Sequence, residues 1–409
     1  MKRVVITGLG VVSPLGNNVQ TTWTNMINGV NGIDRVTRFD ATDFKSKLAA
    51  EVKDFDPLQY FAKSELRRTD LYTQYALAAA TQAYEDSRLA GHVDSERFGV
   101  YFGSGIGGIQ TFTEQAQVLH DKGPTRISPF FIPMMISNMA SGTIAIKFKA
   151  NGPNIAIVSA CATSTHCIGE AFRAIKHGYA DVMLAGGSEA SITPLSYAGF
   201  INIQALSQAQ DKNRASIPFD KERAGFIMGE GGAALILEEL EHAKKRGAHI
   251  YAELVSYACT NDAFHATAPN PDAIASAKAI ALTIQEGNIT GTDIYINAHG
   301  TSTSLNDKTE TMAIKRAFGD NAYKLHISST KSMTGHMLGA AGAIEAIATV
   351  KALQEGIIPP TINYQVPDSD CDLNITPNKA VKREIQFALS NSLGFGGHNG
   401  CLGFKKYKN

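Results

Sequence analysis

The sequence has few cysteines, a single tryptophan and no excess of charge of either sign. Among its 409 residues, five are cysteine, and 38 lysines and arginines balance 38 aspartates and glutamates. The cysteines are odd in number and scattered, with no Cys-x-x-Cys pair. This argues against a disulfide framework or a zinc site and favours a reduced, cytoplasmic protein. The balanced charge removes the electrostatic signature of a nucleic-acid binder, although it is compatible with a local basic patch.

Long apolar runs are also missing. No run of about 18 apolar residues occurs, so we expect no membrane-spanning helix. The N-terminal MKRVVITGLG is typical of a strand that enters a glycine turn, not of a signal peptide. Glycine is frequent, at 37 residues, and proline is ordinary, at 14, which favours neither a disordered nor a fibrous chain. A chain of this length normally divides into two or so domains.

What the sequence does contain is an alternation of short apolar runs and helical patterns rich in small residues. The apolar runs predict strands, most of them buried on both faces, at 4–7, 98–102, 155–159, 182–185, 233–237, 250–255, 294–297, 325–328, 387–390 and 401–404. Helical patterns lie between them, for example at 75–84, 168–175, 273–285 and 338–353. The alternation predicts a layered α/β protein.

A faint internal repeat divides the chain. Residues 97–105 and 293–301 each end a strand in a glycine-containing turn, and a helix crowded with alanine and glycine follows each of them later. We interpret the chain as two similarly built halves, 1–250 and 251–409. On pattern alone, chance similarity between two α/β halves explains the repeat equally well.

Cys161 occupies a strand-to-helix corner. The strand at 155–159 runs into Ala160-Cys161-Ala162-Thr163-Ser164, and an amphipathic helix follows. The dipole and free N–H groups of a helix N-terminus favour a thiolate and lower the pKa of a cysteine, and the same N–H groups can hold an oxyanion. We therefore interpret Cys161 as a candidate nucleophile; the alternative is a buried structural cysteine.

Two histidines lie in small-residue loops after strands, where α/β sheets usually contact ligands. His299 follows the strand at 294–297, and His336 lies between the strand near 327 and an alanine- and glycine-rich helix. A metal site would need a third ligand, for which Asp307 and Glu310 are near in sequence. Cys161 gives the two histidines a better use, as partners of a nucleophile.

Glu345 interrupts an apolar stretch and should be buried. Buried carboxylates are paired, and Lys331 is the obvious partner. This pair is either part of the site or a structural ion pair.

Two glycine-rich segments need separate interpretation. Residues 103–108, GSGIGG, formally match the dinucleotide motif GxGxxG, but Asp121 lies in a polar stretch with no strand before it, so the motif argues only weakly for an oxidoreductase. Residues 394–397, GFGG, place one phenylalanine among three glycines. We interpret them as a mobile gate; the alternative is a tight bend between two core strands.

Together these motifs resemble those of the elongating β-ketoacyl-acyl-carrier-protein synthases, over essentially the whole chain. The resemblance rests on ACATS at 160–164, NAHGTST at 297–303, KSMTGHMLGAAG at 331–342 and GFGG at 394–397. It implies a thiolase-like α/β fold with five α-β-α-β-α layers in two related halves, a homodimer, acyl carrier protein as partner, and neither cofactor nor metal.

The resemblance also implies a role for each site residue. Cys161 would accept the acyl chain, and its N–H and that of Phe395 would form the oxyanion hole. His299 and His336 would bind the malonyl thioester and promote loss of carbon dioxide. Lys331, with Glu345, would control the charge of the histidines. Thr301, Thr303 and Thr267 would contact the pantetheine arm. Ile106 would line the acyl pocket, and Phe395 would be its gate.

Departures and alternatives remain at this stage. His398 and Leu393 stand where many members have Thr and Phe, which could alter the gate or the pocket. A polyketide-type ketosynthase and a catalytically silent scaffold in a carrier-protein complex are the competing functions. An acidic carrier protein would need a basic surface, for which the candidates are Lys63, Arg67, Arg68, Lys122 and Arg126.

Overall fold

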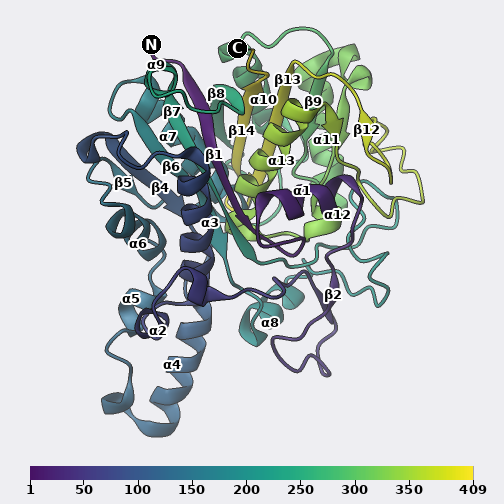
Figure 1. Ribbon diagram of the computed structural model, residues 1–409. Helices are drawn as coiled ribbons and strands as arrows, with labels where there is room; N and C mark the ends of the chain where they lie inside the picture. The colour runs from purple at the N-terminus through teal and green to yellow at the C-terminus, as the bar shows by residue number, and fades with distance from the viewer. Residues whose placement is uncertain (409) are drawn as a thin grey trace.

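The computed structural model describes residues 1–408, and within them ten strands form one mixed sheet in the order β10-β9-β13-β14-β8-β1-β7-β6-β4-β5 (Figure 1). The strands are β1 (Val4–Val12), β4 (Phe98–Gly103), β5 (Asn154–Ile155), β6 (Val182–Glu189), β7 (Gly231–Glu239), β8 (Ala252–Asn261), β9 (Ile294–Asn297), β10 (His326–Ser328), β13 (Phe387–Gly394) and β14 (His398–Lys405). Two short ribbons pair β2 (Asp34–Arg35) with β3 (Leu48–Ala49), and β11 (Ile357–Ile358) with β12 (Val381–Lys382).

The sheet consists of two halves with one topology. A short pairing of β1 with β8, through Val4–Ile6 alone, joins the two halves. One half has the strand order β5-β4-β6-β7-β1, and the other has β10-β9-β13-β14-β8. In each half the first three strands are parallel and the last two run antiparallel to their neighbours. The sequence repeat is therefore structural. The boundary at residue 250 stays a prediction.

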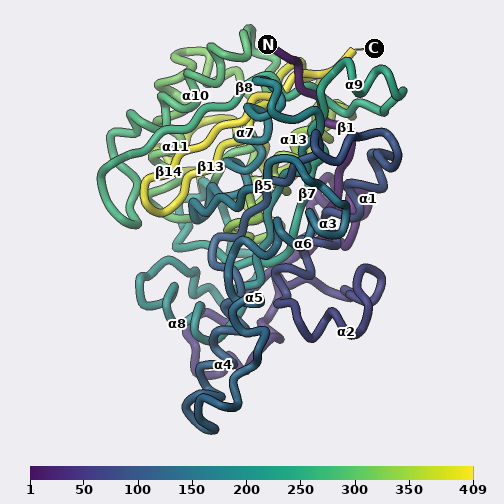
Figure 2. The backbone as a smooth tube through the Cα atoms, turned by 90° about the vertical axis from the view of Figure 1, so that its left-hand side faces the viewer, coloured from purple at the N-terminus to yellow at the C-terminus, as the bar shows by residue number. Residues whose placement is uncertain are grey.

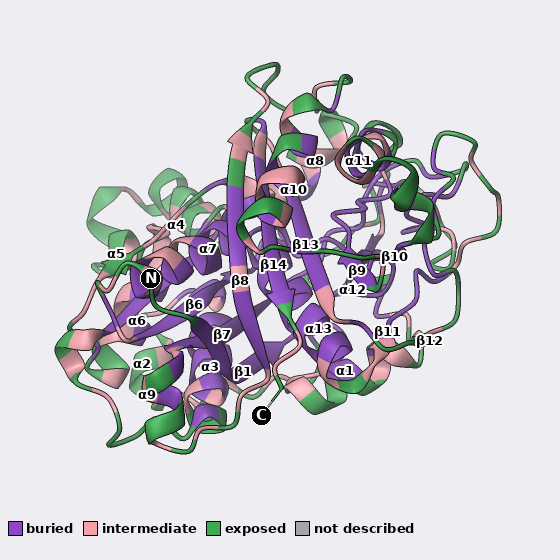
Figure 3. Cartoon of the chain, turned by 90° about the horizontal axis from the view of Figure 1, so that it is seen from above, coloured by how far each residue is buried: buried purple, intermediate pink, exposed green. Residues whose placement is uncertain are grey.

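Helices form the other three layers (Figure 3). α7 (Thr163–Lys176) and α13 (Ala341–Glu355) lie between the two halves and contact strands of both. α3 (Leu71–Ser87) and α6 (Met139–Phe148) cover the outer face of one half, and α10 (Ile274–Glu286) and α11 (Ser304–Phe318) that of the other. This is the predicted α-β-α-β-α arrangement.

The remaining helices lie around these layers. They are α1 (Val19–Ile27), α2 (Lys63–Leu66), α4 (Ile109–Lys122), α5 (Phe131–Met135), α8 (Pro194–Asn202), α9 (Leu240–Lys245) and α12 (Lys331–Thr334). Figure 2 shows α4 extending away from the body of the molecule, with both chain termini at the opposite end. Within residues 1–408 no helix combines the length and the apolarity needed to cross a membrane.

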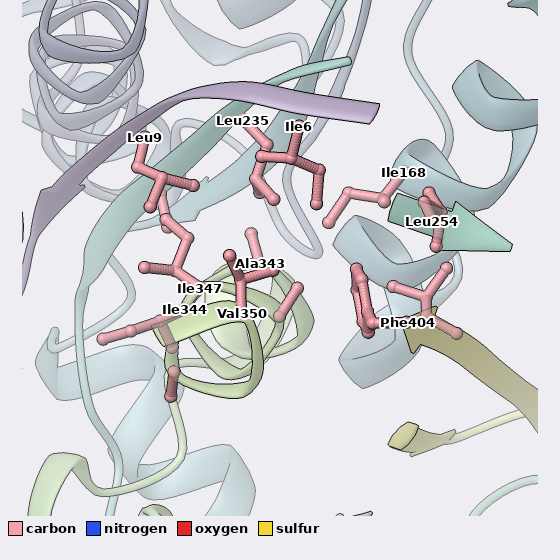
Figure 4. Close-up of a cluster of buried hydrophobic side chains, with 14 of the residues drawn as sticks. Ile6, Leu9, Ile168, Leu235, Leu254, Ala343, Ile344, Ile347, Val350 and Phe404 are labelled. Atoms are coloured by element: carbon pink, nitrogen blue, oxygen red, sulfur yellow. The ribbon is translucent and has the colours of Figure 1, made fainter. Parts of the chain in front are cut away.

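The main core surrounds α13 (Figure 4). This helix is buried on all sides from Ala341 to Leu353, as expected of a helix that is apolar all round. Its Ile344, Ile347 and Val350 belong to one cluster with Leu9 and Leu235 from the strands beside it. Because α13 begins at the site and ends far from it, this packing fixes the position of the loop that precedes the helix.

Most strands begin or end a few residues away from their predicted bounds, and for two of them the structure shows the physical cause. β1 continues to Val12 because Gly8 and Gly10 admit α3 at very short range: a Cβ at Gly10 would lie 2.0 Å from the carbonyl oxygen of Ala79. The strand predicted at 155–159 is reduced to the two residues of β5, since this edge strand pairs only with β4. The chain then leaves the sheet, and the side chain of Val158 is 53% exposed.

Candidate active site

One cavity of about 410 Å³ brings together eight of the ten predicted site residues. It lies where loops from both halves of the fold meet. Its lining includes the predicted residues Ile106, Cys161, Thr267, His299, Thr301, Thr303, His336 and Phe395. Lys331 and Glu345 do not line the cavity; both are almost fully buried, at 1% exposure each.

Cys161 lies in a short 3₁₀ turn, Ala160–Ala162, immediately before α7. The turn is fixed by a hydrogen bond in which the Ser159 N–H donates to Thr163 Oγ1, at 2.9 Å. Ala160 has φ of +50°, a left-handed conformation that is strained for a residue with a Cβ. The predicted strand-to-helix corner is therefore a turn between a loop and a helix, and the nucleophile stands at the helix N-terminus.

The surroundings of Cys161 oppose the thiolate that its place at a helix N-terminus favours. Burial raises the pKa of this thiol to about 12, whereas the Lys331 charge and the backbone N–H of Phe395 act in the opposite direction. A helix N-terminus favours the thiolate, but removal of the sulfur from water by the surrounding loops outweighs it. Cys161 therefore rests as a thiol, and its proton must leave during attack.

Residues 394–397 form a tight turn between the paired strands β13 and β14, in which Gly394 pairs with His398. Gly396 and Gly397 have φ of +86° and +76°, which glycine adopts without strain. Gly394 rests on the cysteine turn: a Cβ there would lie 2.7 Å from Ser159 O and 3.3 Å from Cys161 N. This close contact brings the Phe395 N–H to the sulfur. Whether the turn moves as a gate stays a prediction.

His299 follows β9 and is held by a buried carboxylate. Glu310 on α11 accepts from the His299 N–H at 2.7 Å with one oxygen and from the Gly300 N–H at 2.8 Å with the other. Burial raises the pKa of Glu310 to about 7, and the two N–H donors oppose that rise. Glu310 thus fixes the backbone that carries the imidazole. The sequence analysis considered it only as a metal ligand.

Lys331 connects His299 to Glu345. Its Nζ forms a short ion pair with Glu345 Oε1 and lies 3.4 Å from His299 Nδ1. Because an ammonium has only donors, His299 Nδ1 must accept, and the ring proton is then on Nε2. Burial raises the pKa of Glu345 to about 7, and the Lys331 charge opposes that shift.

His336 is fixed on both sides of its backbone. Its N–H donates to Ile227 O at 2.7 Å, and its carbonyl accepts from the Gly229 N–H at 2.8 Å. Its Nδ1 accepts from the Leu338 N–H at 3.3 Å, so the ring proton is on Nε2 here as well. This Nε2 is buried and has no hydrogen-bond partner within residues 1–408. It is a donor that lacks an acceptor, in the wall of the cavity.

The two imidazoles are neutral. Their ring centroids are 5.3 Å apart and their planes meet at 86°. Burial lowers the pKa of both well below the usual range, and the Lys331 charge lowers both further. A pair of neutral Nε2–H donors can stabilise an oxygen that gains negative charge without transferring a proton to it. That chemistry suits an enolate or an oxyanion.

Three threonines and Ile106 also line the cavity. Thr301 Oγ1 and Thr303 Oγ1 are hydrogen-bonded to each other at 2.9 Å. Thr267 is exposed at the mouth, and Ile106 is partly exposed, at 37%. The contacts predicted for these residues with the pantetheine arm and the acyl chain stay predictions.

Other predicted features lie apart from the cavity chemistry. The carboxylate of Asp307 accepts from the Phe219 N–H at 2.8 Å and does not complete a metal site with the histidines. Within residues 1–408, no three His, Cys, Asp or Glu side chains are grouped as a metal site would require. The five predicted basic residues fall into two groups: three at α2, and two at the far end of α4, a helix about 20 Å long, where Lys122 is its last residue and Arg126 lies in the turn that follows.

Sequence reasoning missed Glu189, at the end of β6. It is completely buried and accepts five hydrogen bonds, from Ser104, Gly105, Ile106, Ser191 and Gly339. One glycine of the GxGxxG segment, Gly105, therefore lies against a carboxylate of the protein itself. A polar residue closing an otherwise apolar buried strand was the only signal in the sequence.

Comparison with family models places the chain among known proteins. The model described as "Beta-ketoacyl synthase, N-terminal domain" matches residues 1–243, and "Beta-ketoacyl synthase, C-terminal domain" matches residues 251–365. Among curated proteins, a 3-oxoacyl-[acyl-carrier-protein] synthase 2 of Synechocystis is 52% identical over 100% of this chain and 99% of its own length. The protein of the same name from Staphylococcus aureus strain COL is 50% identical over the same shares.

Solved structures show the same similarity. A type II polyketide ketosynthase, in complex with its acyl-carrier protein and bound to a hexaketide, superposes with a TM-score of 0.92 at 37% identity. A β-ketoacyl synthase from Burkholderia phymatum superposes with a TM-score of 0.91 at 32% identity. Each comparison covers 100% of both chains.

Proposed function

The chain belongs to the β-ketoacyl synthase family, and on that premise we propose that it elongates acyl chains carried by acyl carrier protein in fatty acid synthesis. The observation that carries the proposal is the meeting of Cys161 with two neutral imidazole donors in one cavity. The products would be 3-oxoacyl-carrier protein, carbon dioxide and free carrier protein.

The first half-reaction transfers the acyl group to Cys161. Its sulfur attacks the thioester carbonyl, the oxyanion is held by the N–H groups of Cys161 and Phe395, and the carrier thiol leaves with the proton of Cys161. Because the thiol pKa is about 12, attack and proton loss must be coupled. The helix dipole of α7 stabilises the charge as it develops.

The second half-reaction uses His299 and His336. The malonyl thioester oxygen accepts from their Nε2–H groups, the bond to the carboxylate breaks, and carbon dioxide leaves. The enolate carbon then attacks the acyl carbonyl on Cys161, and collapse of the tetrahedral intermediate releases the Cys161 sulfur as a thiolate, which takes up a proton from water to restore the thiol. Burial, together with the charge of Lys331, keeps both rings neutral, and Lys331, paired with Glu345, fixes the His299 tautomer. Thr301 and Thr303 would hydrogen-bond the pantetheine arm.

Two partners belong to the proposal. The first is a second copy of the chain, since β5 is an open sheet edge with exposed apolar side chains at Ile155 and Val158. The second is the acidic carrier protein. Lys63, Arg67 and Arg68 at α2 have no carboxylate partner within residues 1–408, although the Arg68 guanidinium lies 4.8 Å from the Phe130 ring centroid. We also propose a cytoplasmic location, which the unpaired state of all five cysteines favours.

The test separates the two half-reactions. Purified protein is given acyl-carrier protein, the acyl-enzyme is measured by intact mass, and malonyl-carrier protein is then added while carbon dioxide and 3-oxoacyl product are measured. We expect His336→Ala to form the acyl-enzyme but to release little carbon dioxide. His326→Ala, on β10 and outside the cavity lining, is the matched control. Loss of acylation with retained decarboxylation would mean that the roles are assigned wrongly.

A polyketide-type ketosynthase is the second candidate, because a structure of that class superposes with a TM-score of 0.92. The higher identity, 52% and 50%, is to the 3-oxoacyl-[acyl-carrier-protein] synthases, which favours the fatty-acid role. Repeated extension without reduction, in the same assay with excess malonyl-carrier protein, would support the polyketide role.

A further inference from the structure

Glu189 connects the two sides of the cavity. One oxygen, Oε2, accepts from the Gly105 N–H at 2.8 Å and from the Gly339 N–H at 3.0 Å. The other, Oε1, accepts from the Ile106 N–H at 3.2 Å and from two hydroxyls. Ile106 lines the cavity, and Gly339 lies in the 3₁₀ turn Leu338–Ala340, three residues after His336.

The junction is built around the carboxylate. A Cβ at Gly105 would lie 2.7 Å from Glu189 Oε2, and a Cβ at Gly339 would lie 2.9 Å from the same oxygen. That second Cβ would also lie 2.3 Å from the Gly105 N. Neither glycine can be replaced without displacing Glu189, and a side chain at position 339 would also displace the Gly105 loop, so the two loops are fixed relative to the same carboxylate.

Glu189 is linked to His336 through a single residue, Leu338. Leu338 donates its N–H to His336 Nδ1, and the next N–H, of Gly339, donates to Glu189. Leu338 has φ of +46°, a left-handed conformation that is unfavourable for leucine and must be held by its neighbours. Without the carboxylate, we expect this turn to relax and the Leu338 N–H to leave the imidazole.

We propose, on the basis of the function proposed above, that Glu189 is a positioning residue that fixes the Nε2–H tautomer of His336 and, at the same time, the Ile106 wall of the acyl pocket. One side chain thereby aligns the decarboxylation donor with the pocket that holds the acyl chain. Glu189 does not contact the reacting atoms; it acts through the Leu338 and Ile106 backbone.

The two oxygens make the proposal testable with two variants. In Glu189→Gln, the amide oxygen can still accept from Gly105 and Gly339, while the amide NH₂ can donate to the hydroxyls of Ser104 and Ser191. Only the Ile106 N–H then loses its acceptor. In Glu189→Met, of similar length, every donor loses its acceptor.

For Glu189→Met we expect decarboxylation to fall about tenfold or more beyond any loss in acylation of Cys161. For Glu189→Gln we expect a much smaller loss of decarboxylation, together with weaker discrimination between acyl chain lengths. ¹⁵N NMR of imidazole nitrogens should show the Nε2–H form of His336 in wild type and in Glu189→Gln, and a mixture of tautomers in Glu189→Met. A His336→Ala sample assigns the signal.

Glu238→Gln is the matched control. Glu238 is also completely buried, on the neighbouring strand β7, but it accepts from Thr7 and Arg246 away from the cavity. It should lower the melting temperature without changing the ratio of decarboxylation to acylation. If the Glu189 variants change that ratio no more than Glu238→Gln does, the proposal is wrong.

Other outcomes are equally decisive. If Glu189→Met does not fold, Glu189→Gln alone decides. We expect it to change the chain-length preference and to leave the His336 tautomer unchanged. If it changes both equally, the proposal is wrong. Failure of the proposed function is distinguishable, since the wild-type protein would then lack acylation or decarboxylation, whereas failure of the Glu189 proposal leaves both intact in wild type.

Discussion

Gly394→Ala should disable acylation by moving a single N–H group. The added Cβ would lie 2.7 Å from Ser159 O and 3.2 Å from Ala162 N, both of them backbone atoms that cannot rotate away. Ordinary non-bonded separations exceed the first distance by roughly half an ångström or more. The end of β13 must therefore move back from the cysteine turn, and the Phe395 N–H moves with it.

The size of the effect follows from the role of that N–H. Removal of one oxyanion donor costs about 10²–10³ in rate, and a displacement short of removal should cost about 10²-fold, or about 2.7 kcal/mol of barrier. The assay is rapid-quench intact mass spectrometry of acyl-Cys161 formation. The melting temperature should fall only modestly, because the clash is confined to a turn.

The control is Gly199→Ala on α8, where an added Cβ meets nothing within 4 Å. This variant should acylate normally and be slightly more stable, since alanine favours a helix. If Gly394→Ala folds and its acylation rate is within about threefold of the wild-type rate, the barrier has risen by less than about 1 kcal/mol. That result would refute the oxyanion role of Phe395.

Phe395→Ala is the complementary change. It leaves the backbone N–H in place and removes the ring, so that acylation of a short chain should persist while chain-length preference or the order of substrate binding changes. Gly396→Val should cost far more, because φ at Gly396 is +86° and valine is strained there. If rate losses in both variants simply follow losses in melting temperature, the turn is a rigid bend and not a gate.

Three further predictions concern charge and assembly. Lys331→Met removes one of the influences that lower the pKa of His299, while burial, the larger one, stays. This pKa should therefore rise, and on acidification decarboxylation should decline at a higher pH than in wild type; identical pH profiles would contradict this. Reversal of Arg67 and Arg68 to Glu should raise KM for carrier-bound substrate but not for a pantetheine analogue, and equal effects on both would exclude docking there. Ile155→Lys at the β5 edge should halve the mass measured by light scattering if the protein is a homodimer built on that edge, and an unchanged mass would place the interface elsewhere.

The sequence predicted those parts of the site that depend on strand ends. β9 begins and ends where its apolar run does, and His299 follows it directly. Cys161 was found because a strand-like run, a small-residue corner and a helical pattern succeed one another. These signals are local, since hydrophobic period and turn residues are written in consecutive positions.

Properties of the site that depend on segments far apart in the sequence could not be predicted from local patterns. The pKa of Cys161 depends on loops from both halves that exclude water from its sulfur, and the sequence near Cys161 shows only the helix N-terminus. The same limitation explains the GxGxxG segment. Its Gly105 lies against Glu189 and Gly339, which are far along the chain, so the spacing of the glycines alone suggested a ligand that the fold does not require.

The structural repeat explains where the site had to form. The parallel strands β4, β5 and β6 of one half correspond in order and direction to β9, β10 and β13 of the other. The carboxyl ends of parallel strands are the usual place for ligand contacts, and each of the six strand ends leads into a segment of this site. Cys161 follows β5 as His336 follows β10, and the Ile106 loop follows β4 as His299 follows β9.

The third pair of strand ends assigns Glu189 its place in this scheme. β6 ends at Glu189, and β13 ends at Gly394, next to Phe395. One strand end supplies an acceptor that holds two loops, and its counterpart supplies a donor to the nucleophile. Once the two halves are recognised as related, the end of β6 is the one strand end with no assigned role, and Glu189 is the residue that lies there. The repeat is therefore a guide to function as well as to fold.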